Sequence, residues 1–567
     1  MKDIFEWLAK NPFMLLFVTV GLAVWVGKFS VKGYGLGMVA AAIVVGCAMS
    51  TWASLYGVKL ELNNFAKSLF YYLFMYGVGL RVGPSFVNSL KGDGLKFTFL
   101  ALLSSLMGLA LCVIGARWLD LPMGAAGGLV AGSQTMSAAI GSAEQAVEQG
   151  AVQLASGTTP EQVSAMIALS YGISYIWGTV GIILICKYLP RWWGIDARAA
   201  AIQYEKENGV RNVDDAGLTG YRPFAARAYK LENREWAGKS IQDFRNKYPE
   251  YRVLNVRRGE DLLGADPDVR LQANDIIALA GTRGDMTQHM GALGPEIDDA
   301  RTLNVPLAQA EILMTNKEAV GRELGSFSRG ELAGQVQVTR IERAGQPIPV
   351  GTGTKLQRLD VMFVAGLTDA VKRAGEILGR IATPNTSTDL LTLSVGMILG
   401  LLIGAISFPA FGASVGLGNA GGLLVSGVIV SSLQSRLRFF GNTPNAARNI
   451  LEDLGLVVFV CIVGINAGNS LLSQLTGALA LKIFLVGFVA CTIPPFIVWA
   501  LGYHVFKINP AVLMGGVAGA RSHSGPCREA AKEINSSVPW IGFPVGYAVS
   551  GILLTIFGYF AMVLAAR

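Results

Sequence analysis

Two stretches far apart in this chain follow the same pattern: residues 129–139 read LVAGSQTMSAA, and residues 516–526 read GVAGARSHSGP. Gly132 of the first stretch aligns with Gly519 of the second, at a spacing of 387 positions. Both stretches are rich in small residues, carry polar side chains near their centre, and are flanked by apolar sequence. A motif of this kind, repeated within one chain, indicates an internal duplication.

A second motif recurs ahead of the first one in each copy. Residues 79–85 read GLRVGPS, and residues 464–470 read GINAGNS, which agree at both glycines and at the final serine. Two motifs repeated in the same order indicate that a whole membrane unit is duplicated. Because duplicated membrane units are the usual architecture of secondary transporters, the pattern predicts a protein of that class.

The charged residues are concentrated in one part of the chain. Of the 567 residues, 52% are hydrophobic and only 15% are charged, against roughly 25% in soluble proteins. Most of the charges lie in 191–380, and the rest of the chain is divided into apolar runs of about 20 residues, the length that spans a bilayer. We therefore expect an α-helical polytopic membrane protein with a soluble insert. The net charge of +8 suits loops that face anionic lipid and requires no nucleic acid.

Each copy of the membrane unit contains five apolar runs and one segment of a different kind. The expected spans are 11–28, 34–53, 65–82, 95–116 and 163–188 in the first copy, and 389–407, 414–433, 455–472, 480–502 and 541–564 in the second. The segments 123–149 and 510–534 are poor lipid-facing helices because their centres are polar. Backbone that breaks at membrane depth must be surrounded by protein or water, so we expect two re-entrant hairpins with tips near Gln134 and Arg521.

The basic residues favour one orientation of these spans. With the N-terminus outside, the loops expected inside carry more Lys and Arg than the loops expected outside, as the positive-inside rule requires. Five spans per copy is an odd number, so the copies become inverted repeats and their hairpins enter from opposite faces. If 123–149 and 510–534 instead cross the membrane completely, the two copies are parallel, and this alternative remains open.

The soluble insert is itself duplicated. The segment LQANDIIALAG (271–281) corresponds to LQRLDVMFVAG (356–366), and in each copy an aspartate, Asp275 or Asp360, begins a short apolar strand. Alternating Val, Ile and Leu predict several such strands, and hence two small α+β modules on the cytoplasmic side. The expected organisation is membrane repeat 1 at 1–190, module 1 at 205–298, module 2 at 299–382 and membrane repeat 2 at 385–567.

Each module of the insert resembles the C-terminal module of RCK (TrkA-C) ligand-sensing domains. A tandem pair of such modules between two copies of a GLRVGPS-type unit resembles the aspartate:alanine exchanger family, over nearly the whole chain. The resemblance implies electrogenic antiport in the bacterial inner membrane, in which aspartate enters, alanine leaves, and a cytoplasmic aspartate decarboxylase converts one into the other. We also expect a homodimer, and an elevator-type movement of the hairpins against a scaffold.

Arg81 is the leading candidate for an anion-binding residue. It lies between Gly79 and Gly83 near the end of an expected span, where a charge is costly and usually faces a cavity or a partner. The planar guanidinium can bind a carboxylate through two parallel hydrogen bonds. Asn466 occupies the matching position of the second copy, which predicts an asymmetric site with one strong anchor. The alternative is an arginine that extends to the membrane interface.

The hairpin tips supply the other candidates. The expected substrate-binding residues are Ser133, Gln134, Thr135 and Ser137 in the first hairpin and Arg521, Ser522, His523 and Ser524 in the second, together with Arg81 and Asn466. Small polar residues beside glycine leave backbone N–H groups free at helix starts, which attract an anionic group. Arg521 adds a full charge, and His523 could titrate near neutral pH. The alternative for both tips is close helix packing by small residues.

Several classes of function are not indicated. The six cysteines form no CxxC pair, and no metal-ligand or nucleophile–base pattern occurs, so we expect no metal, no cofactor and no enzymatic activity. No P-loop and no TVGYG filter are present. No acidic residue falls in the middle of an expected span, which favours substrate exchange over proton symport. The expected partners are the amino acids and membrane lipid, while a succinate-like dicarboxylate exporter and a gated ion channel remain rival functions.

Overall fold

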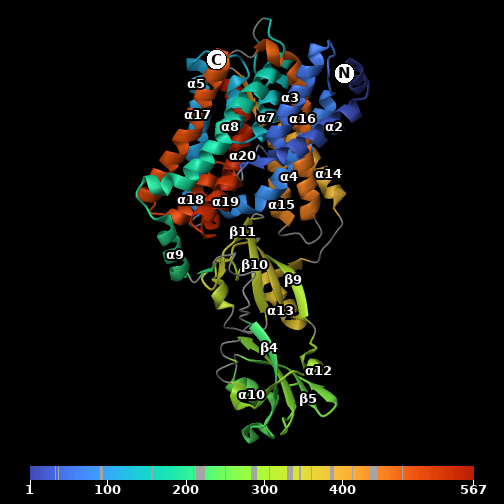
Figure 1. The fold of residues 1–567 in the computed structure, drawn as a ribbon, viewed down its shortest axis with the longest axis vertical. Coiled ribbons are helices and arrows are strands. Elements are labelled where there is room, and N and C mark those ends of the chain that lie inside the picture. The colour runs from blue at the N-terminus through green and yellow to red at the C-terminus, as the bar shows by residue number, and fades with distance from the viewer. Residues whose placement is uncertain are drawn as a thin grey trace. The chain divides into compact units, whose positions relative to one another are not determined.

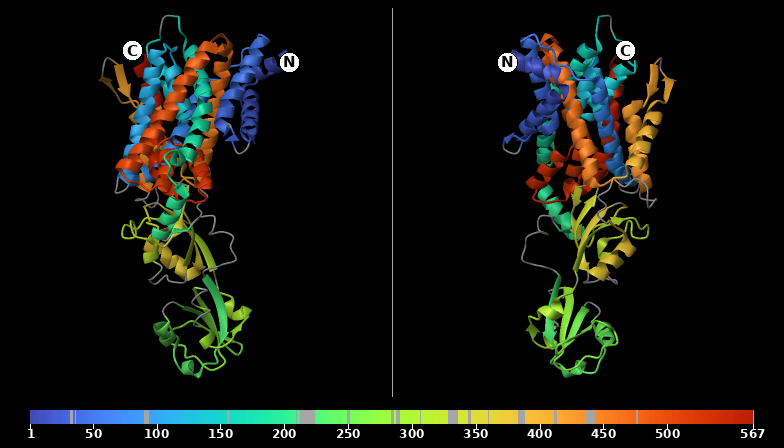
Figure 2. Two further views of the ribbon diagram at one scale, coloured as in Figure 1. Left: turned by 60° about the vertical axis from the view of Figure 1, so that its left-hand side comes forward. Right: turned by 90° about the vertical axis from the view of Figure 1, so that its right-hand side faces the viewer.

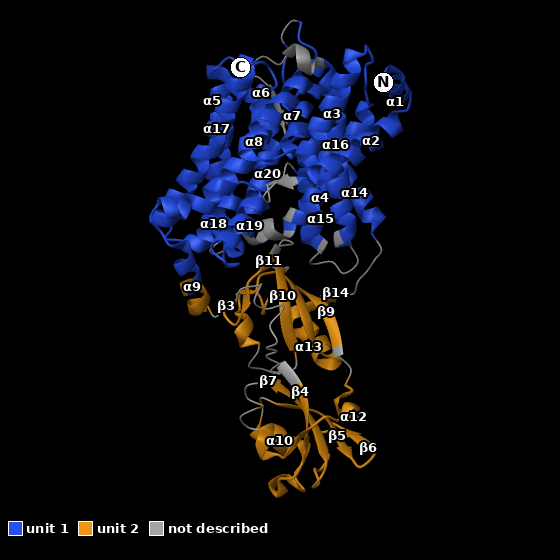
Figure 3. Cartoon of the chain, viewed as in Figure 1, with its two compact units in different colours: residues 1–202, 385–567 blue, residues 203–384 orange. Residues whose placement is uncertain are grey.

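The computed structural model describes most of the chain in two compact units. The described residues are 1–31, 34–35, 37–89, 94–154, 157–208, 210–211, 224–248, 251–282, 286, 290–305, 307–327, 336–343, 346–358, 360–382, 388–410, 413–434, 443–474 and 477–566. Unit 1 consists of residues 1–202 and 385–567, and unit 2 consists of residues 203–384 (Figure 3). This division agrees with the charge distribution, which separated an apolar part from a charged insert.

Unit 1 contains the same series of elements twice (Figure 1). The first half comprises α1 (Lys2–Lys10), α2 (Pro12–Gly27), β1 (Ser30–Val31), β2 (Tyr34–Gly35), α3 (Gly37–Leu55), α4 (Asn64–Ser89), α5 (Gly94–Trp118), α6 (Ala125–Ser133), α7 (Ala138–Glu148) and α8 (Pro160–Trp192), followed by α9 (Ala197–Asn208). The second half comprises α14 (Leu390–Gly404), β15 (Ser407–Ala410), β16 (Ala413–Gly416), α15 (Gly418–Gln434), α16 (Asn445–Gln474), α17 (Gly477–Ala500), α18 (Pro510–Gly519), α19 (Ser524–Glu533) and α20 (Pro539–Ala565). In both halves a β-hairpin follows the first long helix, and two short helices precede the last one. This order agrees with the duplication that the glycine motifs predict.

Six helices among the described residues are long and apolar enough to cross a membrane, and the long helices of unit 1 run side by side (Figure 2). They are Gly37–Leu55, Gly94–Trp118, Pro160–Trp192, Ala446–Asn469, Gly477–Val505 and Pro539–Ala565. The pair α1 and α2, which is bent by 113° at the break between the helices, adds a seventh if the two form one span. The sequence predicted ten spans. Three further apolar helices, Leu390–Gly404, Gly418–Leu433 and Pro510–Gly519, fall short of the required length.

Local sequence signals determine where several of these helices begin. At the start of α8, the side chain of Thr159 accepts a hydrogen bond from the backbone N–H of Gln162, and the Gln162 side chain accepts one from the backbone N–H of Thr159. Pro160 is the first helical residue. At the start of α18, the side chain of Asn509 accepts a hydrogen bond from the backbone N–H of Ala511 at 2.9 Å. Both arrangements satisfy N–H groups that a helix leaves unpaired at its first turn.

The two halves of unit 1 pack against each other reciprocally. Helix α4 packs on α15 and α16 packs on α3, while α5 packs on α20 and α17 packs on α8. A Cβ atom added at Gly79 of α4 would lie 2.4 Å from the carbonyl oxygen of Leu424, and one added at Gly464 of α16 would lie 2.8 Å from that of Ile43. The paired glycine motifs therefore permit two matching close contacts between the halves.

Unit 2 contains two five-stranded antiparallel sheets of the same topology. The first has the order β6-β5-β7-β4-β8 and is built from β4 (Phe224–Lys230), β5 (Arg252–Arg258), β6 (Asp261–Gly264), β7 (Ile276–Thr282) and β8 (Glu296–Ile297). The second has the order β11-β10-β13-β9-β14 and is built from β9 (Leu307–Met314), β10 (Val336–Arg343), β11 (Gln346–Ile348), β13 (Val361–Leu367) and β14 (Gly379–Ala382). Short helices accompany both sheets: α10 (Ile241–Lys247), α12 (Ala300–Leu303) and α13 (Thr368–Leu378). This matches the duplicated strand pattern of the insert.

The two aspartates singled out in the insert hold equivalent positions. The Nε atom of Arg258 donates to Oδ1 of Asp275 at 2.9 Å, and Nε of Arg343 donates to Oδ1 of Asp360 at 2.8 Å. Each arginine also donates from Nη2 to the second carboxylate oxygen, and both aspartates are buried. Paired hydrogen bonds of this geometry hold the last long strand of each sheet to the arginine-bearing strand.

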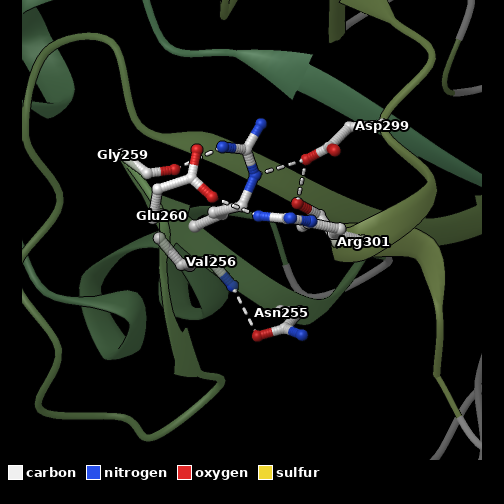
Figure 4. A network of polar contacts seen from close by, with 8 residues as sticks. Asn255, Val256, Gly259, Glu260, Asp299 and Arg301 are labelled. Carbon is white, nitrogen blue, oxygen red and sulfur yellow. Dashed lines mark hydrogen bonds and ion pairs between the residues drawn. The ribbon is translucent and has the colours of Figure 1, made fainter.

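Polar contacts in the first module connect the start of α12 to β5 and to the turn that follows β5 (Figure 4). The Nε atom of Arg257 donates to Asp299 at 2.8 Å, and Arg301 forms an ion pair with Glu260. Burial alone would raise the pKa of the Asp299 carboxyl, but the hydrogen bonds donated by Arg257 and Thr302 hold that pKa below its ordinary value. The network therefore stabilises module 1 while Asp299 is ionised.

Candidate functional site

Two helical hairpins bring their tips together inside unit 1. Helices α6 and α7 form the first and α18 and α19 form the second, and the two pairs lie near opposite ends of the unit (Figure 3). The Nη2 atom of Arg521 donates a hydrogen bond to the carbonyl of Ser133, so the tips are in direct contact. The two sequence stretches that repeat each other therefore meet in space.

The two tips share an uncommon backbone conformation. Thr135 has a φ of +55° and Ser522 has a φ of +51°. Residues other than glycine seldom adopt this left-handed region, and a β-branched residue such as threonine is a clear outlier there. The spacing of the two residues is the same as that of Gly132 and Gly519, so both hairpins reverse direction at the same position of the repeat. Strained backbone of this kind tends to cluster at ligand-binding sites.

A cavity of about 210 Å³ lies against the hairpin tips. Its described lining consists of Val39, Phe74, Val78, Arg81, Thr135, Met136, Ser137, Ala138, Tyr175, Leu456, Ser522, Tyr547 and Gly551. Arg81 is the single charged side chain in that set, and hydroxyl groups come from both tips. The structure thus brings four of the predicted site residues, Arg81, Thr135, Ser137 and Ser522, to one cavity.

The first hairpin presents the start of a helix to this cavity. Ser137 and Ala138 both line it, and α7 begins at Ala138. The hydroxyl of Ser137 lies 2.8 Å from that of Tyr171, which fixes the side chain at the helix start, and Thr135 donates to the carbonyl of Gln134 at 2.7 Å. Because the first N–H groups of a helix carry partial positive charge, this end of α7 adds to the attraction of an anion.

Arg81 is paired with an acidic residue that the sequence analysis missed. Its Nη1 atom lies 2.9 Å from Oε2 of Glu452, and its guanidinium lies 5.6 Å from the ring centre of Tyr547. The Arg81 side chain is 33% exposed, whereas that of Glu452 is 6% exposed. Glu452 lies near the start of the candidate span Ala446–Asn469, and the expected span 455–472 did not include it. The expected span began at 455, which is ten residues after α16 begins.

A signal for Glu452 was nevertheless present in the repeat. Glu452 precedes Asn466 by 14 positions, and Lys67 precedes Arg81 by the same number. The matching position of the first copy is therefore also charged, and the structure buries both Lys67 and Glu452. Aligning the two copies beyond their glycines would have located both residues.

Gln134 and Arg521 occupy the same position in the two hairpins, and both side chains are fully buried. The Nε2 atom of Gln134 donates to the carbonyl of Ala490 at 3.0 Å, and Nη1 of Arg521 donates to the carbonyl of Cys491 at 2.8 Å. Neither residue belongs to the described lining of the 210 Å³ cavity. In this structure they connect the hairpins to the middle of α17.

Two prolines explain why these carbonyls are free to accept hydrogen bonds. Helix α17 contains Pro494 and Pro495, which lie four residues after Ala490 and Cys491. Proline has no backbone N–H, so within a helix it leaves the carbonyl four residues earlier without its usual donor. A buried carbonyl needs another partner, and the two hairpins supply one each.

Three other predicted residues lie at the tips but not along the described lining of this cavity. Ser133 ends α6, and its hydroxyl lies 3.5 Å from the sulfur of Cys112. His523 precedes α19 and is partly buried, with no hydrogen-bond partner for Nδ1 among the described residues. Ser524 is the first residue of α19. Close packing of small residues accounts for Ser133 at this position.

Asn466 lines a different cavity from Arg81. This second cavity, of about 410 Å³, has a described lining of Glu61, Leu62, Asn63, Asn64, Lys67, Glu144, Val147, Glu148, Pro160, Glu161, Ser164, Val463 and Asn466. The Asn466 side chain accepts a hydrogen bond from the backbone N–H of Leu62 at 2.9 Å and donates to its carbonyl at 3.1 Å. The expectation that Arg81 and Asn466 share one site is therefore not met in this structure.

An ion cluster with two buried members, Lys67 and Glu144, and one exposed member, Glu148, lines this second cavity and connects the first hairpin to α4. The ammonium group of Lys67 lies 3.0 Å from Glu144 and 3.0 Å from Glu148, both on α7. The side chains of Lys67 and Glu144 are 10% and 4% exposed. Lys67 lies in the first turn of α4, which begins at Asn64.

Repeat-equivalent positions, meaning positions that align in the two copies, line both cavities. Val78 and Arg81 line the first, and their equivalents Val463 and Asn466 line the second. The pair Tyr547 and Gly551 in the first cavity likewise corresponds to Pro160 and Ser164 in the second. The two cavities thus occupy matching places in the two copies, although they differ in size and charge.

Comparison with known proteins identifies the family of both parts of the chain. The family described as Predicted Permease Membrane Region matches residues 14–191 and 392–563, and the TrkA-C domain matches residues 227–290. The first match covers more than half of the chain and leaves out the insert. The second covers the first of the two similar sheets.

Relatives in other bacteria match the chain along nearly all of its length. An uncharacterized transporter of Bordetella bronchiseptica is 67% identical over 565 residues, covering 100% of both chains. Uncharacterized transporters of Desulfotalea psychrophila and Shewanella oneidensis are each 30% identical, covering 100% and 96% of this chain and 86% and 97% of their own. No solved structure matches the chain.

Proposed function

Because this chain belongs to the family described as Predicted Permease Membrane Region, and is a multi-pass membrane transporter, we propose that it is a secondary active antiporter. The proposed pair is L-aspartate against L-alanine across the bacterial inner membrane. The resemblance to aspartate:alanine exchangers supports this pair. Exchange of an anion for a net-neutral amino acid moves charge, so transport is electrogenic.

The observation that carries the proposal is the 210 Å³ cavity at the hairpin tips. It combines one guanidinium, at Arg81, with the hydroxyls of Thr135, Ser137 and Ser522 in a lining that is otherwise uncharged. A guanidinium binds a carboxylate strongly where water is scarce, and the start of α7 adds a partial positive charge. Arg521 and Gln134 support the site by holding the tips to α17.

The proposed movement is alternating access between two inverted repeats. The hairpins at opposite ends of the unit and the two cavities at repeat-equivalent positions support this view. In an elevator-type cycle, the hairpins and their supporting helices move against the remaining helices, which form a scaffold. We further propose that the protein is a homodimer held together through the scaffold and that its soluble modules are cytoplasmic. An aspartate decarboxylase in the cytoplasm would convert the imported aspartate into the exported alanine.

Counterflow into proteoliposomes tests the exchange itself. Alanine preloaded into the vesicles is expected to accelerate uptake of labelled aspartate, while empty vesicles take it up slowly. Equally fast uptake by empty vesicles would rule out obligatory exchange. If preloaded succinate accelerates uptake and alanine does not, the protein is a dicarboxylate carrier instead.

Arg81→Ala tests the assignment of the site. Loss of one charge-assisted hydrogen bond is expected to weaken aspartate binding on the order of 10- to 100-fold, with a smaller effect on alanine. Arg198→Ala serves as the control, because Arg198 lies on the exposed surface of α9. An equal loss for both substrates would assign Arg81 a structural role only.

A further inference from the structure

Arg81, which lines the 210 Å³ cavity, is paired with the buried carboxylate of Glu452. Glu452 lies 2.9 Å from Arg81 through Oε2, while its Oε1 atom is buried with no hydrogen-bond partner among the described residues. No described residue of the cavity lining carries a negative charge. The net charge at the cavity therefore depends on Glu452, which contacts Arg81 but is not itself among the described lining residues.

The fold makes specific room for this carboxylate. A Cβ atom added at Gly77 of α4 would lie only 3.0 Å from Cγ of Glu452. The Glu452 side chain therefore packs closely against α4 one turn before Arg81. A side chain at position 77 would require the Glu452 side chain to shift by a few tenths of an ångström.

The charges around Glu452 leave the cavity close to neutral. Arg81 and Arg448 are the positive groups that act on Glu452, and Asp453 adds a negative charge next to it in the sequence. Only the Arg81 side chain reaches the cavity, and Glu452 offsets its charge at contact distance. A neutral pair attracts an anion less than an isolated guanidinium does, because opposite charges at this distance largely cancel for a third charge farther away.

We infer that Glu452 sets the charge preference of the Arg81 cavity and makes it a site for α-amino acids rather than for dicarboxylates. The inference rests on the proposed function and names its substrate class. With Glu452 ionised, a zwitterion such as alanine competes with aspartate, and bound aspartate can leave again. Without that carboxylate, Arg81 would hold anions more tightly the more negative they are, and a dicarboxylate without an ammonium group would gain most. Glu452 acts here through Arg81, as a specificity-determining residue.

Glu452→Gln in the full chain tests this, since it removes the charge and keeps the shape. The measurement is inhibition of labelled aspartate exchange in proteoliposomes by unlabelled aspartate, alanine and succinate. The expected result is that the inhibitory concentration of succinate falls about tenfold relative to that of alanine, with aspartate in between. A structural defect would weaken all three inhibitors instead. Equal changes for the three, or weaker binding of succinate, would overturn the inference.

Two further variants keep the test decisive. Asp453→Asn removes a neighbouring charge that is exposed, so the order of the three inhibitors should stay as in the unaltered protein. Glu452→Asp keeps the charge, so the ratio of the inhibitory concentrations of alanine and succinate should stay the same even if less protein folds. If Glu452→Asp shifts this ratio as much as Glu452→Gln does, side-chain length and not charge sets the preference. If Arg81→Ala leaves the inhibitory concentrations of all three compounds unchanged, the proposed site itself is wrong. If Arg81→Ala weakens aspartate more than alanine but Glu452→Gln changes none of the inhibitory concentrations, only the role of Glu452 is refuted.

Discussion

Gln134 and Arg521, which align in the two copies of the membrane unit, donate hydrogen bonds to two consecutive carbonyls of α17, those of Ala490 and Cys491. One donor is neutral and the other is charged, yet both are fully buried and both perform the same task. The difference in charge between the hairpins therefore leaves this connection intact. Both hairpins are thereby attached to the same helix, α17, by residues that differ between the two copies.

The first prediction concerns the prolines that free these carbonyls. Replacing Pro494 by alanine would give the Ala490 carbonyl a donor within α17, so Pro494→Ala should partly compensate for Gln134→Met. Pro495→Ala should likewise compensate for Arg521→Met. In double-mutant cycles on the thermal stability of the detergent-solubilised protein, we expect a coupling of about 1–2 kcal/mol for each matched pair.

The mismatched combinations provide the control. Gln134→Met with Pro495→Ala, and Arg521→Met with Pro494→Ala, should show coupling below about 0.5 kcal/mol, since each proline frees one particular carbonyl. Equal coupling in matched and mismatched pairs would mean that the prolines act only through the general flexibility of α17.

The second prediction concerns the glycine contact between the halves. Gly79→Val should destabilise unit 1 by about 1–3 kcal/mol or prevent its assembly, because its side chain would meet the carbonyl of Leu424. Gly172→Val on α8 is the control, since a Cβ atom there meets nothing within 4 Å. The readout is the fraction of monodisperse protein in gel filtration and its thermal midpoint. Similar behaviour of the two variants would show that the contact tolerates extra volume.

The third prediction concerns the ion cluster on the first hairpin. Lys67→Met leaves Glu144 and Glu148 side by side without their cation, and we expect a loss of about 3–5 kcal/mol in stability. Adding Glu144→Gln should restore part of that loss, because it removes the more deeply buried charge. Lys59→Met breaks an exposed pair with Glu61 and should change stability by no more than about 1 kcal/mol. Thermal unfolding in detergent measures all three, and an effect of Lys67→Met as small as that of Lys59→Met would contradict burial of Lys67 and Glu144.

The fourth prediction concerns the soluble modules. Asp275→Asn removes the charge that pairs with Arg258, and Asp360→Asn does the same for Arg343, so each should destabilise its own module by about 3 kcal/mol. Limited proteolysis of the full chain should then show new cleavage sites confined to 224–297 for Asp275→Asn and to 307–382 for Asp360→Asn. Cleavage spread over both ranges in either variant would mean that the two modules unfold as one unit.

Acid is expected to weaken module 1 through Asp299. The pKa of this carboxyl lies below its ordinary value of 3.8, so its contribution is fully present above about pH 4 and disappears as the pH falls through the pKa of the folded state. Arg257→Met removes a hydrogen-bond donor that lowers this pKa, so proteolytic susceptibility should begin to rise at a higher pH. An unchanged pH profile in Arg257→Met would exclude Asp299 as the responsible group.

Much of the architecture followed from local sequence patterns. The glycine motifs predicted the duplication, and the structure shows why they recur, since Gly79 and Gly464 make equivalent close contacts between the halves. The strand pattern of the insert likewise predicted the position of Asp275 and Asp360. These features depend on residue size, on the spacing of motifs along the chain and on the alternation of apolar residues along a strand. All three can be read directly from the amino-acid sequence.

The partners of the buried polar residues did not follow from the sequence. Arg81 could be named as an anion anchor, but its contact with Glu452 joins helices whose residues lie 371 positions apart. Arg521 was expected to face a substrate, whereas in this structure its Nη1 and Nη2 atoms donate to the carbonyls of Cys491 and Ser133. Pro495 in α17 frees one of those acceptors, the carbonyl of Cys491, and no local pattern connects that proline to the hairpins.

The sequence by itself thus determined a duplicated, apolar membrane unit with a charged, duplicated insert, because composition and spacing act locally along the chain. Only the tertiary structure decided that Arg81 and Asn466 belong to separate cavities and that Glu452 stands behind Arg81. The physical reason is that a buried charge must be satisfied by whatever lies within about 3 Å of it. That neighbour is selected by how the two halves pack, which depends on the whole assembly of helices at once.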